Sequence, residues 1–171
     1  MGYGKRCIDC SEAPMLVGLI SDTHGYVDAR VLEAFKGVQA ILHAGDVGSS
    51  RVLERLQCLA PVTAVRGNMD SGHDTANMPT HLDLSLEGCR VHLVHRLEDA
   101  RPGPNTDVVV FGHTHRPAVE RRDRVLYVNP GTAAARGFRE EATVALLRIE
   151  GGQTHVEVVA LGAPSPPRRG P

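Results

Sequence analysis

The chain has 171 residues, 42% of them hydrophobic and 23% charged, with a formal net charge of −1. This composition fits one globular domain with a substantial core, and the near-neutral charge argues against a general nucleic-acid-binding surface. The longest apolar run near the start, Met15–Ile20, is too short for a signal-peptide core or a membrane span, so we expect a cytoplasmic protein without a membrane partner.

The first half of the chain alternates apolar runs with amphipathic segments. Helices are predicted over Asp28–Gly37 and after a cap at Ser49 or Ser50, because apolar residues recur there at helical spacing. The apolar runs between them predict buried strands at Met15–Ile20, Ala40–Leu42 and Pro61–Val65. This order predicts parallel strands joined by crossover helices.

The second half is dominated by short strands separated by turn signals such as Glu87-Gly88 and Gly151-Gly152. The predicted strands are His81–Leu86, Arg90–Val94, Val108–Phe111, Val119–Arg121, Val125–Asn129, Thr143–Ile149 and His155–Leu161. We therefore expect a parallel α/β half that leads into a mostly antiparallel half, with two sheets packed face to face.

The expected domain covers residues 15–161, between an N-terminal extension of residues 1–14 and a proline-rich tail of residues 162–171. Cys7 and Cys10 stand in a C-x-x-C spacing within the extension. No second pair with zinc-site spacing accompanies them, so we interpret them as reduced surface thiols.

Seven metal-ligand side chains each follow a predicted strand. They are Asp22, His24, Asp46, Asn68, His95, His113 and His115. Two divalent ions that share one carboxylate need about seven protein ligands and lie roughly 3.5–4 Å apart. A single D-x-H or H-x-H pair is weak evidence, but the ordered set predicts a binuclear metal hydrolase.

The ligand chemistry narrows the choice of metal. Carboxylate, imidazole and amide ligands together suit Mn, Fe, Zn, Ni or Co better than Ca or Mg. We assign the bridging carboxylate to Asp46, and the neutral amide of Asn68 would leave the site positive. A positive site suits an anionic phosphate substrate.

These motifs resemble those of the calcineurin-like metallophosphoesterase superfamily. The strings SDTH, HAGD, RGNMD, GHTHRP and NPGT look like its small bacterial and archaeal phosphodiesterase branch, and the resemblance runs from Met15 to Leu161. It implies an α/β fold, a four-layer α/β/β/α sandwich of two mixed sheets. It also implies hydrolysis of a small phosphate ester with two divalent metals, often manganese.

The resemblance also implies residue roles. One metal would take Asp22, His24, Asp46 and His115, and the other would take Asp46, Asn68, His95 and His113. A hydroxide between the metals would attack phosphorus in line, which makes Asp46, Asn68 and His95 the catalytic positions. His43 and Asp70 match positions that hold the ligands in place.

Two departures from the superfamily pattern stand out. Met69 occupies the position of a proton-donating histidine in larger relatives, which leaves the general acid unassigned, with His73 as a candidate. Arg96 replaces an expected glycine and is either a phosphate-contacting residue or a surface charge. The following segment, Leu97–Thr106, holds two prolines where relatives tend to carry a helix.

Other functions stay open at this point. A protein-interaction scaffold on the same fold, with a vestigial metal site, is the main alternative, although all seven ligand positions are filled. A nuclease of the superfamily would need added domains and a basic surface. Relatives are often dimers or tetramers, but the sequence contains no interface signal, so whether the protein is a homo-oligomer stays open. The natural substrate, the preference for diester or monoester and the physiological metal stay open.

Overall fold

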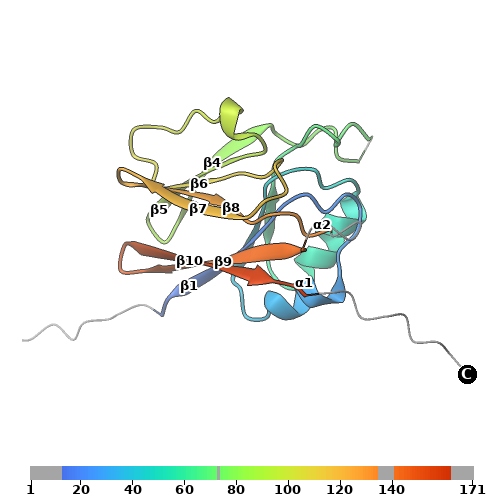
Figure 1. Ribbon diagram of the computed structural model, residues 1–171, viewed down its shortest axis with the longest axis horizontal. Helices are drawn as coiled ribbons and strands as arrows, with labels where there is room; N and C mark the ends of the chain where they lie inside the picture. The colour runs from blue at the N-terminus through green and yellow to red at the C-terminus, as the bar shows by residue number, and fades with distance from the viewer. Residues whose placement is uncertain (1–12, 73, 135–140, 163–171) are drawn as a thin grey trace, which may run out of the picture.

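The computed structural model describes residues 13–72, 74–134 and 141–162, which contain two mixed five-stranded sheets stacked face to face (Figure 1). The first sheet has the order β10–β9–β1–β2–β3. Its strands are β1 (Met15–Ile20), β2 (Ala40–His43), β3 (Val62–Ala64), β9 (Thr143–Glu150) and β10 (Gln153–Ala160). β1, β2 and β3 are parallel, and His43 pairs with both Ile20 and Ala64, so the three strands end at the same level.

The second sheet has the order β4–β5–β6–β8–β7. Its strands are β4 (His81–Leu86), β5 (Cys89–Val94), β6 (Val108–Val110), β7 (Ala118–Arg122) and β8 (Val125–Asn129). β5, β6 and β8 run parallel, while β4 and β7 are antiparallel edge strands. Every predicted strand is present, with ends that differ by up to two residues, which is normal for strand boundaries.

Two short helices, α1 (Ala29–Ala34) and α2 (Ser50–Gln57), cover the outer face of the first sheet. The side chains of Asp28 and Ser49 cap their N-termini by accepting hydrogen bonds from backbone N–H groups. α1 ends earlier than predicted, at Ala34, because the chain turns through Phe35 towards Gly37, whose φ is +82°. No helix in the described ranges is long and apolar enough to cross a lipid bilayer.

The main core fills the space between the two sheets. Leu19 and Leu42 from the first sheet meet Leu93 and Val110 from the second, and all four are essentially inaccessible to solvent. Burial of a leucine or valine side chain stabilises a fold by roughly 1.5–3 kcal/mol. This packing fixes how the sheets lie on each other and therefore which strand ends lie together.

The outer face of the second sheet has a thin cover. A 3₁₀ turn, η1 (Leu97–Asp99), places Leu97 and Ala100 against Val94 and Phe111. No α-helix covers this face in the described part of the chain, so the fourth layer of the expected sandwich consists of this turn and its loop. The fold class, α/β with two packed mixed sheets, is confirmed.

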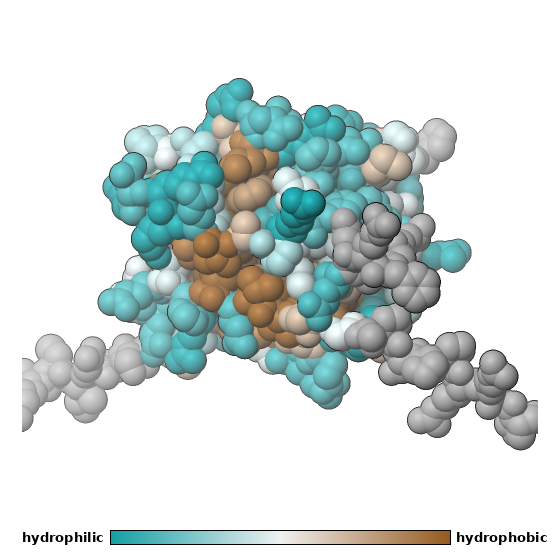
Figure 2. Space-filling view, viewed as in Figure 1, coloured by the Kyte–Doolittle hydropathy of each residue, from teal (hydrophilic) through white to brown (hydrophobic). Residues whose placement is uncertain are grey.

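The edge strands β7 and β10 lie on the same side of the sandwich (Figure 1). Val119 on β7 is 46% exposed and Val158 on β10 is 36% exposed. Figure 2 shows apolar side chains in a band over this side of the molecule. The predicted extension and tail lie almost entirely outside the described residues, as do Cys7 and Cys10.

Candidate metal centre

The seven predicted ligands lie at the carboxyl ends of five strands. Asp22, Asp46 and Asn68 follow β1, β2 and β3, His95 follows β5, and His113 follows β6. The carboxyl ends of parallel strands are the usual place for ligand sites in α/β folds. His95 of the second sheet reaches the first, because its Nδ1 lies 2.8 Å from the carbonyl oxygen of Ala44. The two sheets therefore share one site.

The ligand atoms form two overlapping clusters. In one, ligand atoms of Asp22, His24 and His115 all lie within 4.8 Å of one another, and in the other those of Asp22, Asp46 and His95 do. Asn68 and His113 adjoin the second cluster. Asn68 Oδ1 is 3.0 Å from His95 Nε2, and the rings of His95 and His113 are 5.2 Å apart between centroids. The shared member of the clusters is Asp22, whereas the bridge predicted from the sequence is Asp46.

The arrangement of donors and acceptors fits a cation. A neutral His95 that donates its Nδ1–H to the Ala44 carbonyl has a lone pair on Nε2, and that lone pair faces the acceptor Oδ1 of Asn68. Asp22 Oδ1 is buried and has no hydrogen-bond partner among the described residues, although His115 Nε2 lies 3.3 Å away. Acceptor atoms that face each other in a buried site are stabilised by a bound metal ion.

Burial raises the pKa of the Asp22 carboxyl, and a hydrogen bond from Ser21 at 2.6 Å is the main opposing influence. The nearby Asp46 also raises this pKa, while His95 and His115 lower it. A bound cation would favour the ionised carboxylates, since it supplies the positive charge that a buried pair of acids needs.

The backbone is strained at most of these positions. Five of the seven predicted ligands have positive φ, between 48° and 68°, a region that residues with a Cβ rarely adopt. They are Asp22, His24, Asp46, His113 and His115. Strain of this kind persists where surrounding contacts fix the loop, and it is concentrated at functional sites.

The family assignment follows from a match over most of the chain. Residues 15–152 match the Calcineurin-like phosphoesterase superfamily domain. The chain belongs to the calcineurin-like phosphoesterase superfamily. The resemblance noted from the motifs is therefore confirmed.

Two relatives of similar sequence agree with this assignment, and a solved structure shares the fold. A "Probable metallophosphoesterase" of Methanothermobacter thermautotrophicus is 35% identical over 167 residues, which covers 88% of this chain and 95% of the relative. The "Phosphodiesterase YfcE" of Escherichia coli K12 is 36% identical over 143 residues, covering 67% of this chain and 77% of the relative. The structure of Vacuolar Protein Sorting 29 from Cryptosporidium parvum has the same fold, with a TM-score of 0.69 and 21% identity over 85% of this chain and 97% of that one.

The two residues expected to support the ligands contact the backbone that carries them. Asp70 accepts hydrogen bonds from the N–H groups of Val47, Gly48 and Gly67, at 2.7–3.1 Å. His43 Nε2 lies 2.9 Å from the hydroxyl of Thr23, between Asp22 and His24. Burial lowers the pKa of His43 to about 3, so this ring is neutral near pH 7.

Two residues of the NPGT string, Asn129 and Thr132, also hold the site, a role that was not predicted from the sequence. Asn129 donates to the Gly112 carbonyl and to Thr114, at 2.9 and 3.0 Å, and so fixes the turn that carries His113 and His115. Thr132 donates to the Asp22 carbonyl at 3.0 Å.

Gly67 has to be a glycine because its loop approaches the loop of Asp46 too closely for a side chain. A Cβ on Gly67 would collide with the carboxylate and the backbone nitrogen of Asp46. This approach allows the Met69 N–H to donate to Asp46 Oδ1 at 2.8 Å, which orients the carboxylate.

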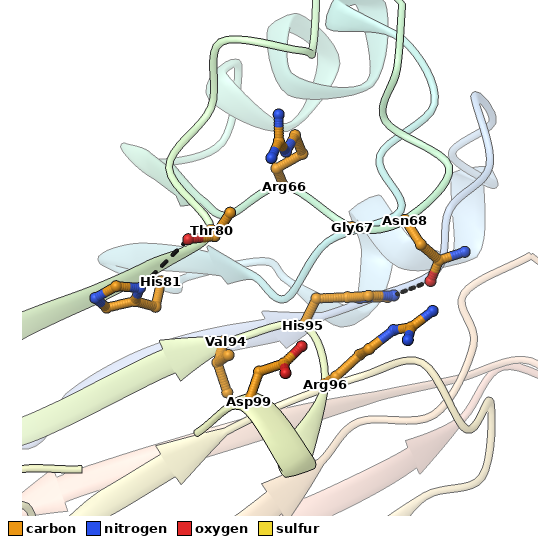
Figure 3. A pocket seen from close by; sticks show the side chains of 9 residues that line it. All are labelled: Arg66, Gly67, Asn68, Thr80, His81, Val94, His95, Arg96 and Asp99. Atoms are coloured by element: carbon orange, nitrogen blue, oxygen red, sulfur yellow. Dashed lines mark hydrogen bonds between the residues drawn. The ribbon is translucent and has the colours of Figure 1, made fainter. Parts of the chain in front are cut away.

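The two departures from the superfamily pattern lie at the rim of the site. Met69 is 61% exposed. Arg96 is half-buried, and its side chain makes no hydrogen bond or ion pair with another described residue. Figure 3 shows its guanidinium alongside the His95–Asn68 pair. His73, the other candidate acid, lies outside the described residues.

Proposed function

We propose that this protein is a phosphodiesterase that binds two divalent cations, which we take to be manganese, through the seven ligands named above. One observation carries the proposal: all seven side chains converge on one edge, where His95 Nε2 lies 3.0 Å from Asn68 Oδ1. Bound divalent cations would supply Lewis acidity and a water of lowered pKa for in-line attack on phosphorus.

The side chains of the chain itself would hold and orient the reactants. Asp22 and Asp46 provide buried negative charge, and Asp46 is the proposed bridge. The amide of Asn68 adds a ligand without adding charge, so the site keeps a net attraction for a phosphate anion. The guanidinium of Arg96, which has no ion-pair partner among the described residues, is placed to bind a non-bridging phosphate oxygen.

A scaffold is the competing function. The likeness to Vacuolar Protein Sorting 29 supports it only at the level of fold, since that protein is 21% identical. A scaffold has no need for acceptor atoms of several side chains held at one point with strained backbone. The complete ligand set therefore favours the enzyme.

The test is an ester panel with the purified full chain loaded with manganese. We expect hydrolysis of bis(p-nitrophenyl) phosphate, with slower hydrolysis of p-nitrophenyl phosphate. His113→Ala should lose activity, while His155→Ala, a change at an exposed position on β10, should keep it. Binding of two metal ions without hydrolysis of any ester would favour the scaffold.

Location in the cytoplasm and self-association stay predictions.

Arg96→Gly should raise KM about tenfold and leave kcat little changed, because binding that is equal in ground and transition states affects KM alone. Steady-state kinetics on an aryl diester checks this result. Arg124→Gly, at the exposed hairpin turn between β7 and β8, is the matched control and should alter neither constant. An unchanged KM in Arg96→Gly would make Arg96 a surface charge.

Met69→His should reduce the dependence of rate on the leaving group. A thioether has no proton to give, so esters with acidic leaving groups should react far faster than alkyl esters in the native protein. A plot of log rate against leaving-group pKa for the native protein, Met69→His and the control Met69→Gln measures the effect. A flat plot for the native protein, with chemistry rate-limiting, would show that another acid is present.

A further inference from the structure

A pocket of about 380 Å³ opens beside the predicted metal ligands Asn68 and His95. One wall comes from the connection between β3 and β4, with Arg66 and Thr80. The opposite wall comes from the end of β5 and from η1, with Arg96 and Asp99 (Figure 3). A substrate phosphate on the metals would therefore have this pocket next to it.

The charges in the pocket are separated. Arg96 lies along the Asn68 side, where the phosphate is expected. The Arg66 guanidinium donates to the Ala76 carbonyl at 3.1 Å and rises away from His95 in Figure 3. Asp99 makes no ion pair with either arginine, and its carboxylate has no hydrogen-bond partner in the described part of the chain. Asp99, on the η1 side, is the one carboxylate among the residues that line the pocket.

The position of Asp99 is fixed by the turn that carries it. Its backbone N–H donates to the Arg96 carbonyl, and that of Ala100 donates to the Leu97 carbonyl, both at 3.1 Å. The turn is further held by the N–H of Arg101, which donates to Nε2 of the buried His92 at 3.3 Å. These contacts fix the backbone of Asp99, and its carboxylate lines the pocket from this turn.

We propose that this pocket binds one of the two esterified alcohol portions of the phosphodiester. Asp99 would select an alcohol portion that carries further, free hydroxyl groups. An ionised carboxylate only accepts hydrogen bonds, and it repels a second anion. The group that faces Asp99 must therefore be a donor, and a polyol such as a glycerol- or sugar-type alcohol supplies neutral hydroxyl donors. This inference rests on the proposed function and names its substrate class.

The test compares the binding of two diesters that differ only in hydroxyl groups. Methyl glyceryl phosphate and methyl propyl phosphate have the same chain length and charge, and both lack a good leaving group. Calorimetric titration of the manganese-loaded full chain should give a Kd about fivefold lower for the glyceryl ester, a modest effect because water competes at an exposed carboxylate. Asp99→Ala should remove this difference.

Glu98→Ala is the matched control, because Glu98 belongs to the same turn, is exposed and does not line the pocket. It should keep the preference, and both variants should bind metal as the native protein does. The proposal is overturned by equal binding of the two diesters, by no measurable binding of either, or by a preference that survives in Asp99→Ala. A preference without hydrolysis of any aryl diester would refute the proposed function and leave this binding site standing.

Discussion

Asp46→Ala is expected to lower turnover by about 100-fold or more and to reduce the bound metal below two ions per chain. Loss of a ligand or of its supporting contacts typically costs about 10–100-fold in metal affinity or activity, and a bridging ligand would affect both ions. Asn68→Ala should weaken mainly one ion, because Asn68 adjoins only the cluster that contains His95.

The measurement is metal stoichiometry by elemental analysis alongside turnover, for Asp46→Ala, Asp22→Ala and Asn68→Ala. Asp46→Asn belongs in the series because asparagine tolerates the left-handed backbone that Asp46 adopts, with φ 54°. Two ions and a normal rate in Asp46→Ala would show that Asp46 is not the bridge. Loss of both ions only in Asp22→Ala would assign the bridge to Asp22, the shared member of the two clusters.

Removal of metal should abolish hydrolysis of an aryl phosphodiester, and manganese should restore it. The reason is that His95, Asn68 and Asp22 offer acceptor atoms, which can hold a cation but cannot by themselves stabilise charge on phosphorus. Chelator-treated protein, reloaded with one metal at a time, gives the rates. Thermal unfolding provides a second measurement, since an ion present at 100 times its Kd stabilises the native state by about 2.7 kcal/mol.

Elemental analysis of the chelated sample is the necessary control for residual metal. Full activity in protein shown to be metal-free would contradict the mechanism. A Tm that does not rise with manganese would contradict the site itself, whatever the activity.

Much of the fold could be predicted because local signals were strong. The apolar runs at β1, β2 and β3 and the residues that follow them are adjacent in sequence, and parallel strands bring their ends to one edge. The sheet to which a late strand belongs is a long-range property. β9 and β10 return to the first sheet beside β1, while β7 and β8 complete the second.

The candidate site likewise has features that local sequence signals predict and features that depend on long-range packing. The convergence of candidate ligands such as Asp22 and His113 could be predicted because both residues follow strands whose carboxyl ends meet at one edge. The contacts of Asn129 and Thr132 with the loops of those ligands depend on the packing of distant segments, so no local pattern contained them. The same holds for Asp99, whose position depends on how η1 lies on the second sheet.

The left-handed backbone at five ligand positions has an evolutionary consequence. Aspartate and histidine are held at φ values that glycine or asparagine would adopt with less strain, so a protein that binds metal through them keeps them at a cost in stability. A lineage that abandoned catalysis would gain stability by replacing them. We therefore expect descendants with other roles to lose Asp22, Asp46 and His115 early, while the sandwich beneath them persists.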